Sequence, residues 1–170
     1  IDAVLQQVVQ SACHVVGARY AAIGVIGDDR RTLVRFETAG IAAAEHERIG
    51  PVPTGQGLLG VLIREARPIR IPSISADARR HGFPPDHPPM ESFLGVPILG
   101  RDRMYGSLYL TEKIGCDEFT DEDERIAVLL AAQAAGHGQG QLAAEVLAEF
   151  FQALEHLQRA RRGALLEQRG

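Results

Sequence analysis

The sequence is poor in cysteine, in basic charge and in long apolar runs, and each shortage excludes a class of protein. Its two cysteines, Cys13 and Cys116, form no CxxC pair, which offers no common zinc site and suits a reducing cytoplasm. The formal net charge of −4 argues against nucleic acid as a partner, because phosphate binding needs a basic surface. No apolar run can cross a bilayer and no signal peptide is visible, so we expect a cytoplasmic protein without membrane contact.

Motifs of enzyme chemistry are equally scarce. The segment TGQGLLG contains glycines but lacks the full phosphate-loop pattern, and Gly55 and Gly57 are better explained as shaping the start of a helix. Neither paired carboxylates nor a nucleophile beside a base stand out. We therefore expect this chain not to be an enzyme.

The remaining composition is that of an ordinary globular domain. Apolar residues make up 45% and charged residues 24% of the 170 residues, enough for one domain with a real core and an appendage. The chain opens at Ile1 within an amphipathic pattern, so we expect it to be part of a longer protein.

Periodicity predicts an α+β fold. Apolar spacing favours helices at 1–16, 41–49, 54–66 and 119–135, and alternation favours strands at 21–27, 32–38, 68–74, 93–100 and 104–112. Thr54 and Thr120 are the expected N-caps, with Asp123 three residues after the second. Strands that cluster late, with helices at both ends, indicate helices packed against a sheet.

The stretch HGFPPDHPPM, residues 81–90, places four of the nine prolines around His87. Each proline fixes its own φ and restricts the residue before it, so the loop is rigid before any ligand arrives. A histidine on such a loop loses less conformational entropy when it binds a metal. The pattern therefore predicts a preorganised ligand loop, although a lone loop histidine is also compatible with a solvated surface residue.

The order of motifs resembles a GAF domain over about residues 1–136. PVPTGQGLLGVLI, PIRIPSI, FLGVPIL, MYGSLYLTEK and FTDEDERIAVLLAAQAA follow one another in the order of that family. The resemblance implies a central antiparallel sheet, a helical layer on one face that is used for dimerization, and a ligand pocket on the other face.

The proline-rich stretch narrows the resemblance. Together with SFLGVP and LYLTEK it is similar to the heme-binding GAF domains of the actinobacterial DevS/DosT-type oxygen and redox sensor kinases. The resemblance implies a b-type heme with His87 as the proximal iron ligand and Tyr109 in the distal pocket. The other heme-pocket residues that it implies are Phe83, Met90, Phe93 and Gly24. His81 is the alternative ligand on the same loop.

The implied function is that of a heme-based sensor of oxygen, nitric oxide, carbon monoxide or iron redox state. Such a domain regulates an output domain absent from this chain, as in a two-component histidine kinase, and forms a homodimer through its helices. A GAF domain without heme, acting in dimerization or binding a small molecule such as a cyclic nucleotide, is the alternative. Tyr109 would then be a packing residue with its hydroxyl at the rim of the core.

Three features depart from the family pattern. Glu91 stands where arginine usually follows PPM, and Gly24 stands where some relatives have a carboxylate that restricts access to heme, so we expect more room for oxygen there. The glycines at 136, 138 and 140 weaken a helix, which sets the predicted GAF domain at 1–138 and a helical extension at 139–170. Apolar spacing in the extension fits either a dimeric coiled coil or a helix that lies on its own domain.

Overall fold

The described part of the chain forms the α+β fold that the sequence predicts. A computed structural model describes residues 2–30, 32–49, 56–80, 87–100 and 103–136. Its helices are α1 (Asp2–Val16), α2 (Ala43–Ile49), α3 (Gly57–Glu65) and α4 (Asp121–Gly136). Its strands are β1 (Ala18–Ile26), β2 (Leu33–Ala39), β3 (Ile69–Ile71), β4 (Phe93–Leu99) and β5 (Met104–Lys113). The predicted domain boundary at 138 and the extension 139–170 lie outside the described residues.

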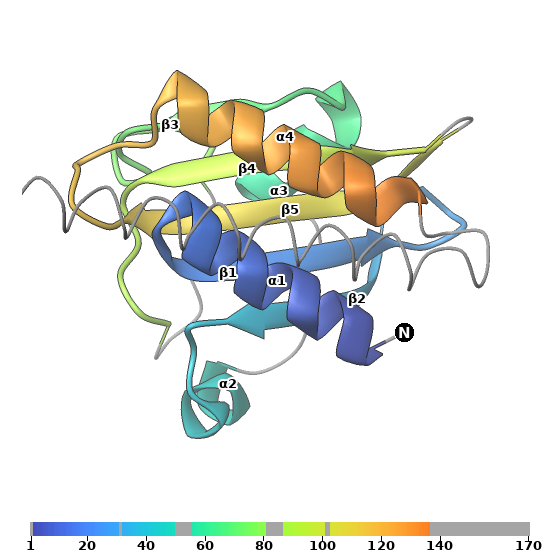
Figure 1. The fold of residues 1–170 in the computed structure, drawn as a ribbon, viewed down its shortest axis with the longest axis horizontal. Helices are drawn as coiled ribbons and strands as arrows, with labels where there is room; N and C mark the ends of the chain where they lie inside the picture. The colour runs from blue at the N-terminus through green and yellow to red at the C-terminus, as the bar shows by residue number, and fades with distance from the viewer. Residues whose placement is uncertain (1, 31, 50–55, 81–86, 101–102, 137–170) are drawn as a thin grey trace, which may run out of the picture. The chain divides into compact units, whose positions relative to one another are not determined.

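The five strands form one antiparallel sheet in the order β2-β1-β5-β4-β3. In Figure 1, α1 and α4 lie on the viewer's side of this sheet and α3 lies behind it. Because side chains alternate along a strand, each central strand supplies residues to both layers. The face toward α1 and α4 is buried and apolar, with Ile23, Leu94, Val96, Leu108 and Leu110.

The opposite side of the sheet, which we call the α3 face, carries a second buried cluster. Helix α3 contacts β4 and β5 there. The residues of this cluster are Ala22, Leu58, Val61, Leu62, Ile69, Ile71, Ile74, Met90, Phe93 and Tyr109. The sheet thus separates two cores, one toward α1 and α4 and one toward α3.

The start of α3 differs from the prediction. We expected the helix to begin after an N-cap at Thr54, which lies outside the described residues. The described helix begins at Gly57, with Gln56 at the N-cap in extended backbone and without a side-chain cap. Gly57 has a φ of +60°, a left-handed conformation that glycine adopts readily, which agrees with its predicted role at the helix entry.

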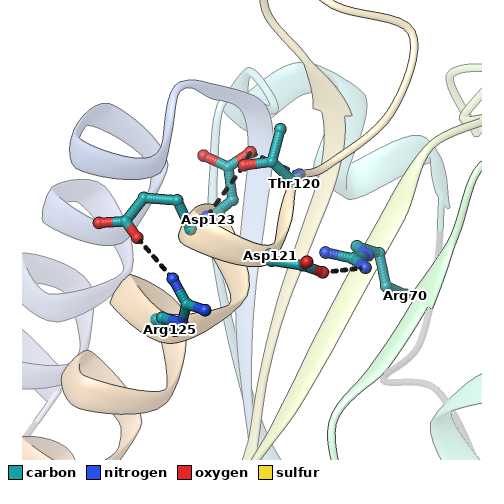
Figure 2. Close-up of polar contacts among 6 residues, drawn as sticks. Arg70, Thr120, Asp121, Asp123 and Arg125 are labelled. Atoms are coloured by element: carbon teal, nitrogen blue, oxygen red, sulfur yellow. Dashed lines mark hydrogen bonds and ion pairs between the residues drawn. The ribbon is translucent and has the colours of Figure 1, made fainter.

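The start of α4 agrees with the predicted cap. The Thr120 backbone N–H and hydroxyl donate to Asp123 Oδ2 at 2.8 and 2.9 Å, and the Asp123 N–H donates to the Thr120 hydroxyl at 3.2 Å. Figure 2 shows this reciprocal pair, beside an ion pair that joins Asp121 to Arg70 of β3. Two orphan donors of the first helical turn are thereby satisfied.

One ammonium group joins three elements at the end of β5. Lys113 Nζ donates to Asp123 Oδ1 of α4 at 2.8 Å and to the Val16 carbonyl of α1 at 2.6 Å. Both charged side chains are largely buried, with exposed fractions of 14% for Lys113 and 10% for Asp123. Burial alone raises the pKa of Asp123, but hydrogen bonds from Lys113 and Thr120 outweigh it, and the pKa lies below its usual range.

This arrangement predicts a strong effect of removing the ammonium. Lys113→Met leaves the Asp123 carboxylate buried without its cation, and we expect it to lower the free energy of unfolding by about 3–5 kcal/mol in urea titrations. The matched control is Arg125→Met, which breaks the exposed pair with Glu122 and costs less than about 0.5 kcal/mol.

The same pair predicts a pH dependence. The folded-state pKa of Asp123 is lowered, so its contribution is present above about pH 4, the unfolded carboxyl's range, and is lost as pH falls through the folded value. The stability difference between wild type and Lys113→Met should therefore shrink in acid. Equal losses for Lys113→Met and Arg125→Met at neutral pH would contradict this account.

Candidate functional site

The candidate site centres on Tyr109, in the middle of β5. Tyr109 lies between Ala22 of β1 and Gly95 of β4 in the sheet register, and only 4% of it is exposed. Its ring packs at tilted angles against Phe36 and Phe93, with centroid distances of 6.1 and 6.3 Å. Tyr109 is therefore a core residue of the α3 face, and its hydroxyl does not reach solvent at the rim.

Two glycines let other side chains approach the Tyr109 ring. At Gly95, a Cβ atom would collide with Leu62 of α3 and with the Phe93 ring. At Gly24, a Cβ atom would lie 3.0 Å from Leu33 Cδ2 and 3.2 Å from Tyr109 Cε2. The expectation that Gly24 opens room for oxygen is thus corrected, because Leu33 and Tyr109 fill the space that a side chain would take.

Two hydroxyl groups are buried on this face without a hydrogen-bond partner among the described residues. They belong to Tyr109 and to Ser107, two positions earlier on the same strand face, which is completely buried. Burial raises the pKa of Tyr109 to about 12, and the neighbouring Ser107 hydroxyl opposes this rise in part. No hydrogen bond of good geometry joins the two groups here, and each unsatisfied hydroxyl costs about 1–3 kcal/mol.

The described end of the proline-rich loop begins at His87, which is half-buried. Its Nδ1 lies 2.8 Å from the carbonyl oxygen of Pro88. A carbonyl only accepts hydrogen bonds, so this contact is a hydrogen bond only when Nδ1 carries a proton. In a neutral ring with this hydrogen bond, Nε2 is the nitrogen that could ligate a metal.

The segment that follows the proline-rich loop contacts β5, the strand that carries Tyr109. Met90 is buried, and the Thr111 hydroxyl donates to its sulfur at 3.1 Å. The Lys113 N–H donates to the Ser92 hydroxyl at 2.9 Å. These contacts fix the segment from Met90 to Ser92 against the end of β5.

Glu91 connects the end of the same loop to the segment after β3. Its carboxylate Oε2 accepts hydrogen bonds from the hydroxyls of Ser73 and Ser75 at 2.8 and 2.9 Å, and the Ile74 N–H donates to the Glu91 carbonyl at 2.8 Å. The hydroxyls of Ser73 and Ser75 lower the pKa of this carboxyl. Glu91 therefore ties the segment after β3 to the start of β4.

A family model described as the GAF domain matches residues 1–136, which is most of the chain. The chain belongs to the GAF family. Its structure resembles the GAF domain of a phosphoenolpyruvate-protein phosphotransferase (ptsP) from Coxiella burnetii, with 22% identity and a TM-score of 0.67 over 90% of this chain and 86% of that one. It resembles the second GAF domain of DevS from Mycobacterium smegmatis, with 25% identity and a TM-score of 0.58 over 89% and 97%.

A methyl-accepting chemotaxis protein has the same fold, with 21% identity and a TM-score of 0.65 over 79% of this chain and 86% of that one. The family model shows a GAF domain, and these likenesses show its fold. At such low identity, they do not extend to a particular ligand.

The GAF domain brings several of the predicted site residues together. Met90, Phe93 and Tyr109 belong to one buried cluster, Gly24 lies beside the Tyr109 ring, and His87 is three residues from Met90. Phe83 and the alternative ligand His81 lie outside the described residues. Sequence reasoning missed Leu62 and Phe36, for which it had no signal. It also missed Ser107, which the alternation of side chains along a strand could have placed on the face of Tyr109.

The described site contains few polar groups, and its surroundings are apolar. Among the described residues no three His, Cys, Asp or Glu side chains cluster to hold a metal ion. The α3 face instead provides two buried hydroxyls and the thioether of Met90, and the His87 imidazole lies three residues before Met90 in the chain. These side chains suit a bound cofactor that needs one ligand from the protein and few polar contacts.

The buried Tyr109 hydroxyl predicts an unusual gain of stability on its removal. Tyr109→Phe deletes an unsatisfied hydroxyl and leaves the ring, so we expect the ligand-free domain to gain about 1 kcal/mol at pH 7. The folded-state pKa of Tyr109 is raised from 10.0 to about 12. The wild-type domain therefore keeps its full stability below pH 10 and loses stability as the pH rises toward 12, because the unfolded chain ionises first.

Urea titrations between pH 7 and pH 11 test both effects. The advantage of Tyr109→Phe should grow above pH 10, toward about 2–3 kcal/mol more at full ionisation. Tyr105→Phe, at a half-buried tyrosine of the same strand, is the matched control and should give no gain at pH 7. A loss of stability in Tyr109→Phe at pH 7 would mean that the hydroxyl has a partner in solution.

Proposed function

We propose that this GAF domain is a heme-based sensor of a diatomic gas or of iron redox state. The observation that carries the proposal is the buried Tyr109 hydroxyl, which has no hydrogen-bond partner among the described residues, together with the contact of His87 Nδ1 with the Pro88 carbonyl. The signal would pass to an output domain absent from this chain, for which a histidine kinase of the DevS type is the proposed class.

The residues fit a heme on the proximal side. A histidine that ligates iron typically donates its other ring N–H to a carbonyl, which orients the ring and makes it more basic. His87 makes such a bond through Nδ1, within a loop whose return is anchored by Glu91 and Met90. The flanking prolines support the same role, because they restrict the backbone on both sides of the ligand.

The residues also fit on the distal side. A heme bound there would supply an iron that takes a diatomic ligand or changes its oxidation state. Tyr109 would hold a hydrogen-bond donor that stays neutral at physiological pH, because its pKa is about 12. Phe36 and Phe93 surround that donor with apolar surface, which strengthens any hydrogen bond that it makes.

Heme binding requires that the residues packed over the α3 face move outward. Leu58, Leu62 and Met90 pack into the cluster that contains Tyr109. Helix α3 and the segment 87–92 lie outside the sheet, so they are the parts that would shift outward while β1, β4 and β5 stay paired. The heme proposal depends on the motif and on this site, since the likeness to the second DevS GAF domain supports the fold alone.

We propose no catalytic role for the chain. The Cys13 thiol donates to the Ala18 carbonyl at 3.0 Å, and burial raises its pKa, which disfavours the reactive thiolate. None of the described helices is long and apolar enough to span a membrane. A cytoplasmic location and the absence of nucleic-acid partners remain proposals from composition.

A regulatory dimerization module without heme is the second candidate. It is favoured by the close packing of the α3 face and by two exposed apolar residues of α4, Val128 and Leu129, with exposed fractions of 39% and 63%. In this case the helical face would form a homodimer and Tyr109 would be a packing residue. A cyclic nucleotide is a less suitable ligand, because the described part of the α3 face offers it no cationic side chain.

Hemin titration of the purified ligand-free protein tests the heme proposal. We expect wild type to bind one hemin per chain with a Soret band, and His87→Ala to lose most of this binding because the iron loses its ligand. His14→Ala is the matched control, an exposed histidine of α1, and should bind hemin as wild type does.

The titration separates the candidates. Equal hemin binding by wild type and His87→Ala would refute the ligand assignment and favour His81. No hemin binding by folded wild type would refute the heme function and leave the dimerization module.

A further inference from the structure

We propose that Ser107 is a positioning residue for Tyr109, which directs the phenol proton toward the ligand and thereby sets ligand specificity. This inference rests on the proposed heme function. It starts from the two hydroxyls on the α3 face, both buried and both without a hydrogen-bond partner among the described residues. Buried hydroxyls are rarely left unpaired, and such groups commonly mark a site for a ligand or a water molecule.

The sheet register puts the two hydroxyls in one row. Ser107 pairs with Gly24 of β1, and directly paired residues have their Cβ atoms about 5 Å apart. Tyr109 Cε2 lies 3.2 Å from the position of a Cβ at Gly24. This ring carbon is next to the one that bears the hydroxyl, so the Tyr109 ring leans along the strand toward the Gly24–Ser107 pair.

Few other polar groups near Ser107 could form a hydrogen bond with its hydroxyl. Its neighbour on the other side is Pro97 of β4, and proline has no N–H to donate. Gly24 contributes no side chain, and Leu33 Cδ2 fills the space above it. Among the described residues, the Tyr109 hydroxyl is therefore the polar group that is best placed for Ser107.

The direction of the hydrogen bond follows from the needs of a ligand. If Ser107 donates to the phenol oxygen, the phenol proton has to point away from Ser107. The strand leaves it the direction away from the sheet, toward the α3 layer. A hydrogen bond received by the phenol oxygen also makes its own O–H a stronger donor. The same donation stabilises the phenolate, which agrees with the lowering effect of Ser107 on the pKa of Tyr109.

Specificity for the ligand follows from this arrangement. Dioxygen bound to ferrous heme accepts a hydrogen bond well because it carries partial negative charge, whereas carbon monoxide is a poorer acceptor. A phenol fixed and strengthened by Ser107 thus favours dioxygen over carbon monoxide. A tyrosine without this neighbour would spend part of its time with the proton turned away.

The first test uses the ligand-free protein and does not depend on heme. Urea unfolding midpoints are measured for wild type, Ser107→Ala, Tyr109→Phe and the double variant. Each single change removes a poorly satisfied buried hydroxyl and also leaves the other hydroxyl without its neighbour. If the two groups contact each other, the midpoint of the double variant will therefore lie above the value expected from the sum of the single changes. Additive midpoints would overturn the contact between the two residues.

The second test measures the ratio of dioxygen to carbon monoxide affinity in the heme-loaded protein. We expect Ser107→Ala to lower this ratio about three- to tenfold, the effect of one neutral hydrogen bond. Ser107→Thr keeps a hydroxyl and should stay within about twofold of wild type. In a Tyr109→Phe background, Ser107→Ala should have no further effect, because Ser107 acts through the phenol.

The outcomes separate the two proposals. A ratio unchanged by Ser107→Ala, or lowered equally in the Tyr109→Phe background, would overturn the positioning role while the heme function stands. If wild type binds no hemin, the heme function fails and with it the ligand specificity, whereas the unfolding midpoints still decide whether Ser107 and Tyr109 are coupled.

Discussion

The alternation of side chains along β5 is the constraint on which the rest of the domain depends. This strand is central in the sheet, between β1 and β4, and is buried from Gly106 to Leu110. Leu108 and Leu110 therefore belong to the core under α1 and α4, while Ser107, Tyr109 and Thr111 belong to the α3 face. A shift of register by one residue would exchange these two sets and destroy both cores.

The same strand connects the site to the helices. Thr111 holds Met90 at the end of the proline-rich loop, and Lys113, two residues later, holds the ends of α1 and α4. A displacement of the loop at Met90 or Ser92 thus acts on the strand segment that anchors both helices. This is the physical route by which the α3 face can influence the helical layer, and it needs no contact between ligand and helix.

Much of this architecture follows from the sequence because it depends on local pattern. Period-two alternation in MYGSLYLTE placed Tyr109 and Leu108 on opposite faces, and the Thr120–Asp123 spacing gave the cap of α4. The site itself could be predicted only in part. Leu62 and Phe36 reach Tyr109 through tertiary packing, which leaves no local signal, and the filling of the space at Gly24 by Leu33 depends on the pairing of β1 with β2. The partners of Glu91 lie 16 and 18 residues earlier in the chain, so the identity of residue 91 alone could not predict them.

The central proposal is that the α3 face holds a heme through the imidazole of His87. Resonance Raman spectroscopy of the hemin-loaded protein, reduced and free of gas, tests it most directly. The account predicts a five-coordinate ferrous heme with an iron–histidine stretching band typical of a neutral imidazole whose Nδ1 proton is hydrogen-bonded to a carbonyl. A six-coordinate spectrum, or a five-coordinate spectrum without an iron–histidine band, would contradict it.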